Sequence, residues 1–324
     1  MGDVKASDIA DFLGTNLIGQ DFLVYSVSSF SNPKDNSLVF IKKEFNSLNF
    51  KSLLVLCTQK DYKNSDKQSS LSYIFCKNPR LAFAKVTQKF FVKDKQPFIH
   101  ETAVIANDAV IHPSVSIGAY SVIESGVTID DGTVIRNQVS ISENVKIGKF
   151  CYINSGAVIG ENGFGFDFEE NKVPVRLPSL GNVKIDDYVE IGSLSTIARG
   201  TLDNTVIGSH TKIDDHVHIA HNCIIGKNCI ITACAELSGS VTIGENCWIG
   251  PNSSIIQKVK IGSNVTVGIG SVVTSDVEAN KKVMGLEGLE LRNLLKIKKK
   301  NRIWKIKLNF IINSWVENEF AIIL

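Results

Sequence analysis

The hydrophobic residues of this chain recur at every sixth position. Isoleucine fills each sixth position from Ile99 to Ile159, and the same spacing, filled by isoleucine, leucine or valine, returns from Ile185 to Ile197 and from Ile207 to Val273. Six residues advance an α-helix by about 600°, which would scatter these side chains over all of its faces. A solenoid fits better, because one short strand plus one corner uses six residues and three such units close a triangular coil.

The position two residues before each isoleucine is mostly small or β-branched, as at Ala103, Val115 and Ala157. Such residues suit strands and tight inward corners. The repeats number 26, which predicts nearly nine coils around a shared apolar axis. At roughly 4.8 Å per coil, the prism is about 40 Å long.

The regions on either side of the repeats lack this spacing. Residues 1–96 are expected to form a small α/β domain, residues 97–275 the solenoid, and residues 276–324 a helical segment with leucines in helical spacing from Leu286 onward. The expected elements of the first domain are strands at Phe22–Ser26, Ser37–Ile41, Leu53–Leu56 and Leu71–Phe75, and a helix at Pro79–Phe90. Proline suits the first turn of a helix because no N–H is needed there.

The composition, 44% apolar and 21% charged over 324 residues, is typical of a soluble protein of two or three domains. A net charge of +2 predicts no nucleic-acid partner. The amino terminus lacks a basic region followed by an apolar run, and the final FAIIL is too short to cross a bilayer, so we expect a cytoplasmic protein without a transmembrane segment. The seven cysteines include no CxxC pair and are interpreted as reduced packing residues, with a metal or disulfide role as the alternative.

Two interruptions of the repeat indicate where chemistry lies, since an insertion adds nothing to a solenoid core and usually serves a site or an interface. The first, at residues 160–182, alternates glycines with Phe164, Phe166 and Phe168. This aromatic strip either covers an apolar ligand or packs on a neighbouring subunit. The second adds four residues between Ile197 and Ile207.

Three of the six histidines cluster after the second interruption, at His216, His218 and His221. Because Ile219 points inward, strand alternation turns His218 outward and places His221 at an outward-facing corner. An exposed histidine is often merely solvated. A neutral imidazole is also the usual general base for an attacking amine or hydroxyl.

Several motifs resemble one family. ENGFGF at 161–166, VPVRLPSLGNVKI, TIARGTLDNTVIG and KIDDHVHIAHNCIIG are similar to UDP-3-O-acylglucosamine N-acyltransferase of lipid A biosynthesis, and SLVFI and NPRLAFAKV resemble its amino-terminal domain. The resemblance implies a left-handed parallel β-helix, a homotrimer with active sites between subunits, and acyl transfer from acyl carrier protein to the amine of a nucleotide-linked sugar. It implies no metal and no tightly bound cofactor.

The resemblance also implies roles for individual residues. His221 takes the position of the catalytic histidine, an N–H near Gly239 is expected to hold the oxyanion, and Asp203 is expected to orient the imidazole. The residues expected to bind substrate are Phe40, Lys43, Phe45, Asn46, Phe164, Phe166, His218, Asn222 and Lys258.

This chain departs from the family pattern at several of these positions. Lys258 stands in place of a second active-site histidine, and Ala198 replaces an aspartate. The residues after Phe40 differ from the asparagine and tyrosine with which the family grips uracil, because Lys43 and Asn46 lie at those spacings and Phe45 comes one place early. The nucleotide-linked acceptor is therefore left open.

Other functions fit parts of the chain. Residues 241–277 equally resemble acetyl-CoA-dependent N-acetyltransferases of nucleotide-linked amino sugars for surface polysaccharides, and the basic run from Lys296 to Lys307 suits an acidic carrier protein, the phosphates of coenzyme A, or simply solvent. A gamma-class carbonic anhydrase is a remote alternative, because His216 and His221 have a similar spacing but no third histidine lies between His112 and His210. A scaffold without chemistry would not explain the aromatic loop and the histidines together.

Overall fold

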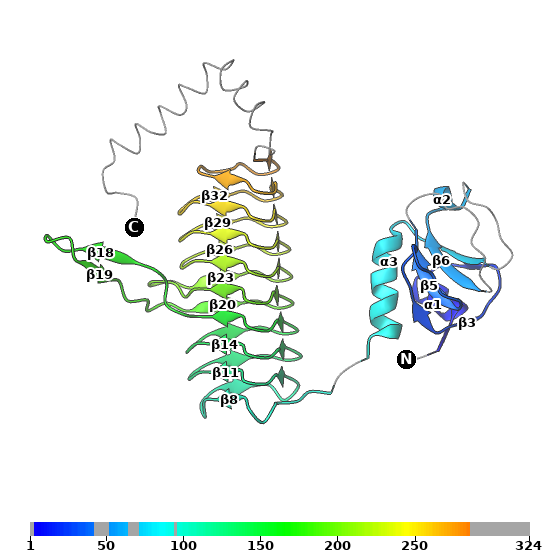
Figure 1. Cartoon of the computed structure of the whole chain (residues 1–324), viewed down its shortest axis with the longest axis horizontal. Helices are drawn as coiled ribbons and strands as arrows, with labels where there is room; N and C mark the ends of the chain where they lie inside the picture. The colour runs from blue at the N-terminus through cyan, green and yellow to red at the C-terminus, as the bar shows by residue number, and fades with distance from the viewer. Residues whose placement is uncertain (1–2, 42–51, 64–70, 94–95, 286–324) are drawn as a thin grey trace, which may run out of the picture. The chain divides into compact units, whose positions relative to one another are not determined.

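The computed structural model describes residues 3–41, 52–63, 71–93 and 96–285, and the chain divides into two compact units, Met1–Gln96 and Pro97–Leu324. The first unit is built on a five-stranded sheet with strand order β2-β7-β6-β5-β4 (Figure 1). Its elements are β1 (Val4–Lys5), α1 (Ala6–Phe12), β2 (Leu17–Ile18), β3 (Leu23–Val24), β4 (Ser26–Val27), β5 (Ser37–Phe40), β6 (Leu53–Cys57), α2 (Gln59–Lys63), β7 (Leu71–Phe75), α3 (Pro79–Val86) and the π-helical turn η1 (Thr87–Phe91). The predicted α/β character of this region is confirmed.

Both faces of this sheet are buried, because alternate residues of each strand enter two separate cores. Leu38, Leu54 and Ile74 pack with α1 and α3, whereas Val39 and Val55 pack on the opposite face. A continuous apolar run, as in β6, is typical of a parallel strand covered on both sides.

Three predictions for this unit need correction. The helix at Ala6–Phe12 was not predicted, because its seven residues carry only one turn of apolar spacing, at Ala6, Ile9 and Ala10, all of which are buried. The expected strand Phe22–Ser26 is two strands that pair in different sheets. The helix from Pro79 is capped by the Asn78 side chain, which accepts from the N–H of Leu81 at 3.2 Å, but its α-helical part ends at Val86 and continues as the π-helical turn.

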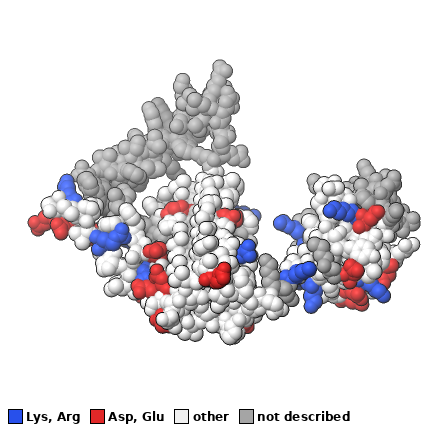
Figure 2. All heavy atoms as spheres, turned by 60° about the horizontal axis from the view of Figure 1, so that its bottom comes forward, with Lys and Arg blue, Asp and Glu red and all other residues white. Residues whose placement is uncertain are grey.

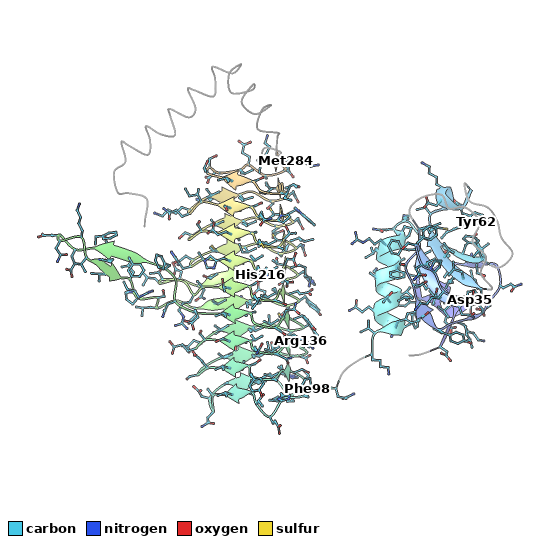
Figure 3. The ribbon with its side chains drawn as sticks, in the orientation of Figure 1. Asp35, Tyr62, Phe98, Arg136, His216 and Met284 are labelled. Carbon is cyan, nitrogen blue, oxygen red and sulfur yellow. The ribbon has the colours of Figure 1, made fainter. Side chains whose placement is uncertain are left out.

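The second unit is a parallel β-solenoid, as predicted. Its described part has three sheets of nine, nine and eight strands, and Phe98 and Met284 mark its two ends (Figure 3). One sheet runs β8 (Val104–Ile105), β11 (Val122–Ile123), β14 (Ser140–Ile141), β17 (Val158–Ile159), β22 (Thr196–Ile197), β25 (His218–Ile219), β28 (Glu236–Leu237), β31 (Ser254–Ile255) and β34 (Val272–Val273). The second runs β9 (Val110–Ile111), β12 (Thr128–Ile129), β15 (Lys146–Ile147), β20 (Val183–Ile185), β23 (Thr205–Ile207), β26 (Ile224–Ile225), β29 (Thr242–Ile243) and β32 (Lys260–Ile261). The third runs β10 (Ser116–Ile117), β13 (Val134–Ile135), β16 (Tyr152–Ile153), β21 (Glu190–Ile191), β24 (Lys212–Ile213), β27 (Ile230–Ile231), β30 (Trp248–Ile249), β33 (Thr266–Val267) and β35 (Lys282–Val283).

The repeated isoleucines stack along the solenoid axis. Ile117 pairs with Ile135, eighteen residues later, and both are buried. Between Ile99 and Val273 the register changes only at the two interruptions: Ile147 pairs with Ile185 across the first, and Ile197 with Ile219 across the second. Both insertions therefore leave the coil as loops without disturbing the apolar axis. The first loop carries a hairpin, β18 (Phe166–Phe168) paired with β19 (Pro174–Arg176), which projects from the solenoid (Figure 1).

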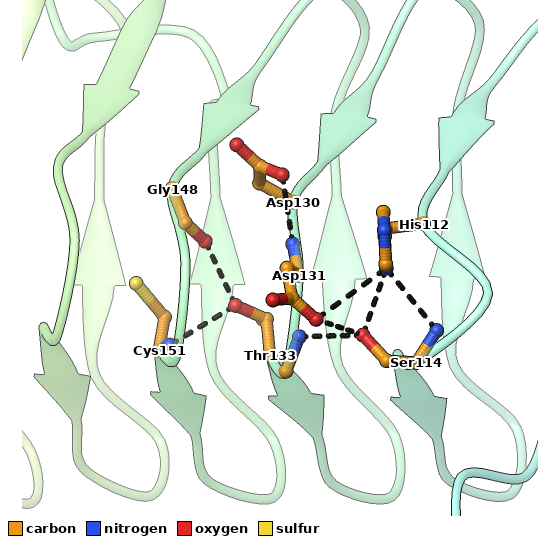
Figure 4. Close-up of polar contacts among 8 residues, drawn as sticks. His112, Ser114, Asp130, Asp131, Thr133, Gly148 and Cys151 are labelled. Carbon is orange, nitrogen blue, oxygen red and sulfur yellow. Dashed lines mark hydrogen bonds and ion pairs between the residues drawn. The ribbon is translucent and has the colours of Figure 1, made fainter.

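Small hydroxyl side chains form hydrogen bonds with backbone groups at the corners of the coils. Thr133 donates from Oγ1 to the carbonyl of Gly148 at 2.8 Å and accepts from the N–H of Cys151 at 3.0 Å, which joins successive coils (Figure 4). At a neighbouring corner Ser114 Oγ accepts from the N–H of Gly132 at 2.7 Å. Ser121, Ser195 and Thr211 repeat the bridge of Thr133. These bonds occupy polar groups that would otherwise be costly to bury.

The interpretation of the cysteines as packing residues is confirmed for the five that are buried, namely Cys57, Cys151, Cys223, Cys229 and Cys247. The boundary predicted at residue 276 is wrong, because Val277 still pairs with Ile261 and β35 adds a strand beside β33. The basic run from Lys296 and the expected helix from Leu286 lie outside the described residues. In the residues that are described, no helix is both long and apolar enough to cross a membrane.

Candidate active site

The histidine pair lies at one corner of the solenoid. His218 is the outward residue of β25, next to the buried Ile219, and His221 follows at the half-buried corner before β26. His216 belongs to a different corner, between β24 and β25, and it is labelled in Figure 3. Among the residues the structure describes, no cluster of three or more histidine, cysteine or acidic side chains is arranged to hold a metal ion.

The hydrogen bonds of Asn222 define the tautomer of His221. Asn222 Oδ1 lies 3.0 Å from the backbone nitrogen of Thr201, and an N–H can only donate. The same oxygen is 3.0 Å from Nδ1 of His221, so it accepts there as well. Nδ1 therefore carries the proton, and the lone pair of Nε2 is free to take one.

Asn222, and not Asp203, orients the imidazole in this structure. The side chain of Asp203 is exposed, and the backbone carbonyl of Asp203 packs closely against Gly181 and Gly200. The four-residue insertion explains the difference: it folds back so that the Thr201 N–H, and not a carboxylate, reaches the residue beside His221. In the sequence, the asparagine directly after His221 was the feature that could have indicated this hydrogen-bond partner.

Two glycines press against the His221 ring. A Cβ on Gly239 would lie 2.7 Å from Cε1 and 2.8 Å from Nε2, and a Cβ on Gly163 would lie 2.8 Å from Cβ of His221 and 3.0 Å from Cδ2. Such distances are shorter than van der Waals contact, so only glycine allows the backbone to come this close. Gly239 thus borders the reactive edge of the ring, while Gly163, at the root of the extruded loop, borders its base.

The Gly239 amide is suitably placed to stabilise negative charge. Its carbonyl accepts from the N–H of Lys258 at 2.9 Å, but in the described part of the chain its own N–H has no acceptor. An unpaired backbone N–H beside a general base can hydrogen-bond to an oxyanion that forms there. Lys258 follows at the same corner with an exposed side chain.

His218 lies in a polar column on the outer face of its sheet. Its Nδ1 is 2.6 Å from Oγ1 of Thr196 in the preceding coil, and Glu236 lies at the paired position of the following coil. Burial by these neighbours lowers the pKa of His218 below its ordinary value of 6.5, the carboxylate of Glu236 opposes this shift, and His221 adds to it. The shift favours the neutral imidazole of His218.

Replacing Glu236 with glutamine is expected to lower the pKa of His218 further, because the carboxylate that raises it loses its charge. Glutamine still accepts from Ser238 Oγ, which bonds Glu236 Oε1 at 2.9 Å, so the fold is preserved. A pH titration of the histidine signals by NMR measures the shift, with His218→Gln to assign the resonance. An unchanged or raised pKa would show that Glu236 does not act on this ring.

The direction of the pKa shift also sets a pH dependence of stability. As the pH falls, the unfolded chain binds a proton at His218 at a higher pH than the folded protein does. The stability linked to His218 is therefore present above pH 6.5 and is lost as the pH falls through the lowered pKa of the folded state.

A buried arginine fastens the extruded loop to the solenoid. Arg199 is 7% exposed, and its Nε donates to the carbonyl of Gly160 at 2.7 Å. Its two terminal nitrogens bond Glu143, at 3.1 Å to Oε1 and 2.8 Å to the backbone carbonyl. Arg199 was not among the predicted site residues, although it stands in the ARGTLDN motif of the second interruption.

The remaining candidate residues lie elsewhere. Phe164 is 79% exposed and its ring centroid lies 4.8 Å from that of Phe166 within the projecting loop. Phe40 belongs to the first unit, where its ring lies 5.0 Å from Phe83 and borders a cavity of about 500 Å³. Lys43, Phe45 and Asn46 lie outside the described residues.

The chain is similar to several known bacterial proteins. The model of the bacterial transferase hexapeptide (six repeats) matches residues 108–142, 204–239 and 240–275. UDP-3-O-acylglucosamine N-acyltransferase from Coxiella burnetii is 46% identical over 182 residues, which cover 50% of this chain and 53% of the relative. The enzyme of that name from Pseudomonas syringae pv. syringae is 31% identical over 259 residues, which cover 73% of this chain and 72% of the relative.

Solved structures give the same fold. LpxA from Acinetobacter baumannii is 29% identical and superposes with a TM-score of 0.52 over 63% of this chain and 77% of that one. UDP-N-acetylglucosamine acyltransferase from Francisella novicida is 25% identical, with a TM-score of 0.54 over 70% of this chain and 88% of that one.

The parallel β-solenoid carries the hexapeptide repeats of the bacterial transferases. Within that class, the chain belongs to the UDP-3-O-acylglucosamine N-acyltransferase family. It spans about half the length of the Coxiella relatives that it matches.

Proposed function

We propose that this protein transfers an acyl group from a thioester donor to the amine of a nucleotide-linked amino sugar, as a step of lipid A or surface-glycan biosynthesis. The observation that carries the proposal is the corner at His221, where a free Nε2 lone pair borders the unpaired N–H of Gly239. General base and oxyanion donor are the two groups that aminolysis of a thioester needs.

In the proposed reaction, the sugar amine attacks the thioester carbonyl and Nε2 of His221 takes a proton from the attacking nitrogen. The carbonyl oxygen becomes an oxyanion, which the Gly239 N–H stabilises. The tetrahedral intermediate then collapses: the C–S bond breaks, the amide is complete, and the leaving thiolate takes the proton from the imidazolium. The Nδ1–H bond to Asn222 stabilises the imidazolium without accepting its proton.

The acceptor is proposed to be an amine, although the solved relatives include an enzyme named UDP-N-acetylglucosamine O-acyltransferase, from Moraxella catarrhalis. The same base and oxyanion donor would serve a hydroxyl acceptor. The sequence relatives named N-acyltransferase reach 46% identity, against 30% for that structure, which favours the amine.

The first unit is proposed to bind the nucleotide. Phe40 borders a cavity with Phe83 and Arg80, an arrangement that offers an aromatic face to a base and a cation to a phosphate. Lys43, Phe45 and Asn46 remain candidates for the same role from the sequence alone.

The projecting loop is proposed to meet a second copy of the chain and the acyl group. Phe164 and Leu180 are 79% and 72% exposed, and much of the solenoid surface seen in Figure 2 lacks charged side chains. A large contiguous patch of exposed apolar side chains marks an interaction site. We propose a homotrimer in which Phe164 and Phe166 line the path of the acyl group, and His218 and Lys258 lie near the sugar. The proposed enzyme is cytoplasmic and receives its acyl group from acyl carrier protein.

The test is a panel of donors and acceptors analysed by mass spectrometry. Long-chain acyl carrier protein and acetyl-CoA are each offered with amino sugars linked to different nucleotide bases. Product from the carrier protein alone is expected. Product from acetyl-CoA alone would instead identify an N-acetyltransferase for surface polysaccharides, and no product from either would refute the proposed activity.

A further inference from the structure

We propose that Arg176 is a positioning residue for the acyl-transfer reaction: acting through the backbone of Gly163, it holds the imidazole of His221 in its reactive orientation. This inference rests on the proposed function of His221. It assigns the extruded hairpin a task in catalysis besides covering substrate, since the root of the hairpin forms one wall around the general base.

The contact between Gly163 and His221 is the first step of the argument. A Cβ added to Gly163 would approach Cβ, Cγ and Cδ2 of His221 to 2.8–3.1 Å, so the glycine backbone lies directly on the stem of the side chain. Gly239 covers the opposite end of the ring, near Cε1 and Nε2. With Asn222 on Nδ1, three contacts restrict the rotation of the imidazole. Two come from the coils, and the third depends on the hairpin root staying in place.

Arg176 fixes that root. Its Nη1 donates to the carbonyl of Gly163 at 3.2 Å, and the Gly163 N–H donates to Ser179 Oγ at 3.3 Å. Both partners belong to the returning arm of the hairpin, so they tie the outgoing arm to it at the residue that touches His221. The root is fastened on its other side, where Arg199 holds Gly160 to Glu143.

The geometry of the hairpin explains why an arginine stands at this position. Arg176 pairs with Phe166 across the two strands, and its Cζ lies 4.6 Å from the centre of the Phe166 ring. The planar guanidinium can stack on the ring and still direct an N–H back to Gly163. A lysine has one ammonium and cannot serve both contacts equally, so it is expected to restore only part of the function.

The experiment compares Arg176→Ala and Arg176→Lys with Lys172→Asn, which removes one positive charge at the tip of the same hairpin and suits the left-handed backbone there, where φ is 64°. The expected loss in kcat is about 10- to 100-fold for Arg176→Ala, since a small misplacement of a catalytic group costs this much. Arg176→Lys should be intermediate and Lys172→Asn close to wild type. The KM values should change little, because the base acts in the transition state.

A second measurement reports on the ring itself. NMR of protein labelled with ¹³C-histidine distinguishes the Nδ1–H from the Nε2–H tautomer, and the His221 signal should shift from a single Nδ1–H form toward a mixture in Arg176→Ala. The thermal unfolding midpoint and the gel-filtration volume of the full chain should not change, because Arg176 is exposed and outside the solenoid core. Gly163→Ala, whose Cβ would displace the ring, should show the same NMR shift independently of the arginine.

The outcomes separate the two proposals. If His221→Ala turns over like wild type, the assignment of the base is wrong whatever Arg176 does. If His221→Ala is inactive while Arg176→Ala keeps the wild-type kcat and the wild-type His221 signal, Arg176 has no positioning role. A higher KM with unchanged kcat in Arg176→Ala would likewise overturn the inference, because it would make Arg176 a substrate-binding residue.

Discussion

Replacing His221 with alanine is expected to reduce kcat by about 10²- to 10⁴-fold, the usual contribution of a general base. The physical reason is that Nε2 is the free acceptor at this corner, while Nδ1 is occupied by Asn222. Steady-state rates with acyl carrier protein thioester and amino sugar measure the loss. The fold should survive, because His221 is only half-buried and lies outside the isoleucine axis.

The matched control is His216, an exposed histidine at another corner of the same solenoid. Its φ of 58° lies in the left-handed region, so asparagine, which tolerates that region, is the suitable replacement. His216→Asn should keep wild-type kcat. Equal losses in both variants would indicate a general effect on the solenoid, and near-normal turnover of His221→Ala would remove this residue from the mechanism.

Replacing Gly239 with alanine is expected to lower kcat by about 10²- to 10³-fold, comparable with the loss of an oxyanion donor. The added methyl group would stand 2.8 Å from Nε2, so it pushes the imidazole aside and fills the space where the thioester carbonyl is proposed to bind. The backbone of Gly239 is not in the left-handed region, so alanine introduces no strain of its own. Single-turnover rates measured with saturating substrates isolate this effect from binding.

Gly165→Ala is the control for this substitution. A Cβ there would meet Leu177 at 3.6 Å, an ordinary contact, and Gly165 also lies outside the left-handed region. It should leave kcat unchanged. Normal single-turnover rates in Gly239→Ala would show that the ring and the carbonyl do not occupy this corner as described.

The solenoid follows directly from the sequence, because its determinant is one-dimensional. Each sixth residue is apolar and must face the axis, so the spacing alone specifies the coils and the outward direction of His218. The interruptions are equally visible, since a shift in the spacing cannot be absorbed by a close-packed core. The end of the solenoid was predicted too early, at residue 275, because Val277 comes four residues after Val273 and so breaks the six-residue spacing.

The arrangement within the site could not be read from the same pattern. The partner of His221 depends on how a four-residue insertion folds back, which brings the Thr201 N–H and Asn222 together and turns the Asp203 side chain to solvent. The contacts of Gly163 and Arg176 depend on a hairpin that leaves the repeat altogether. These are long-range contacts without periodicity, and only the folded chain reveals them.

The most direct test of the proposed activity is the chemical bond in the product made from UDP-3-O-acylglucosamine and a long-chain acyl carrier protein thioester. Mass spectrometry should find the acceptor enlarged by one acyl group, and tandem fragmentation should place that group on the sugar nitrogen. The product should survive mild alkali, as an amide does. An alkali-labile ester on the sugar would contradict N-acyl transfer, and an unmodified acceptor would contradict acyl transfer to this sugar.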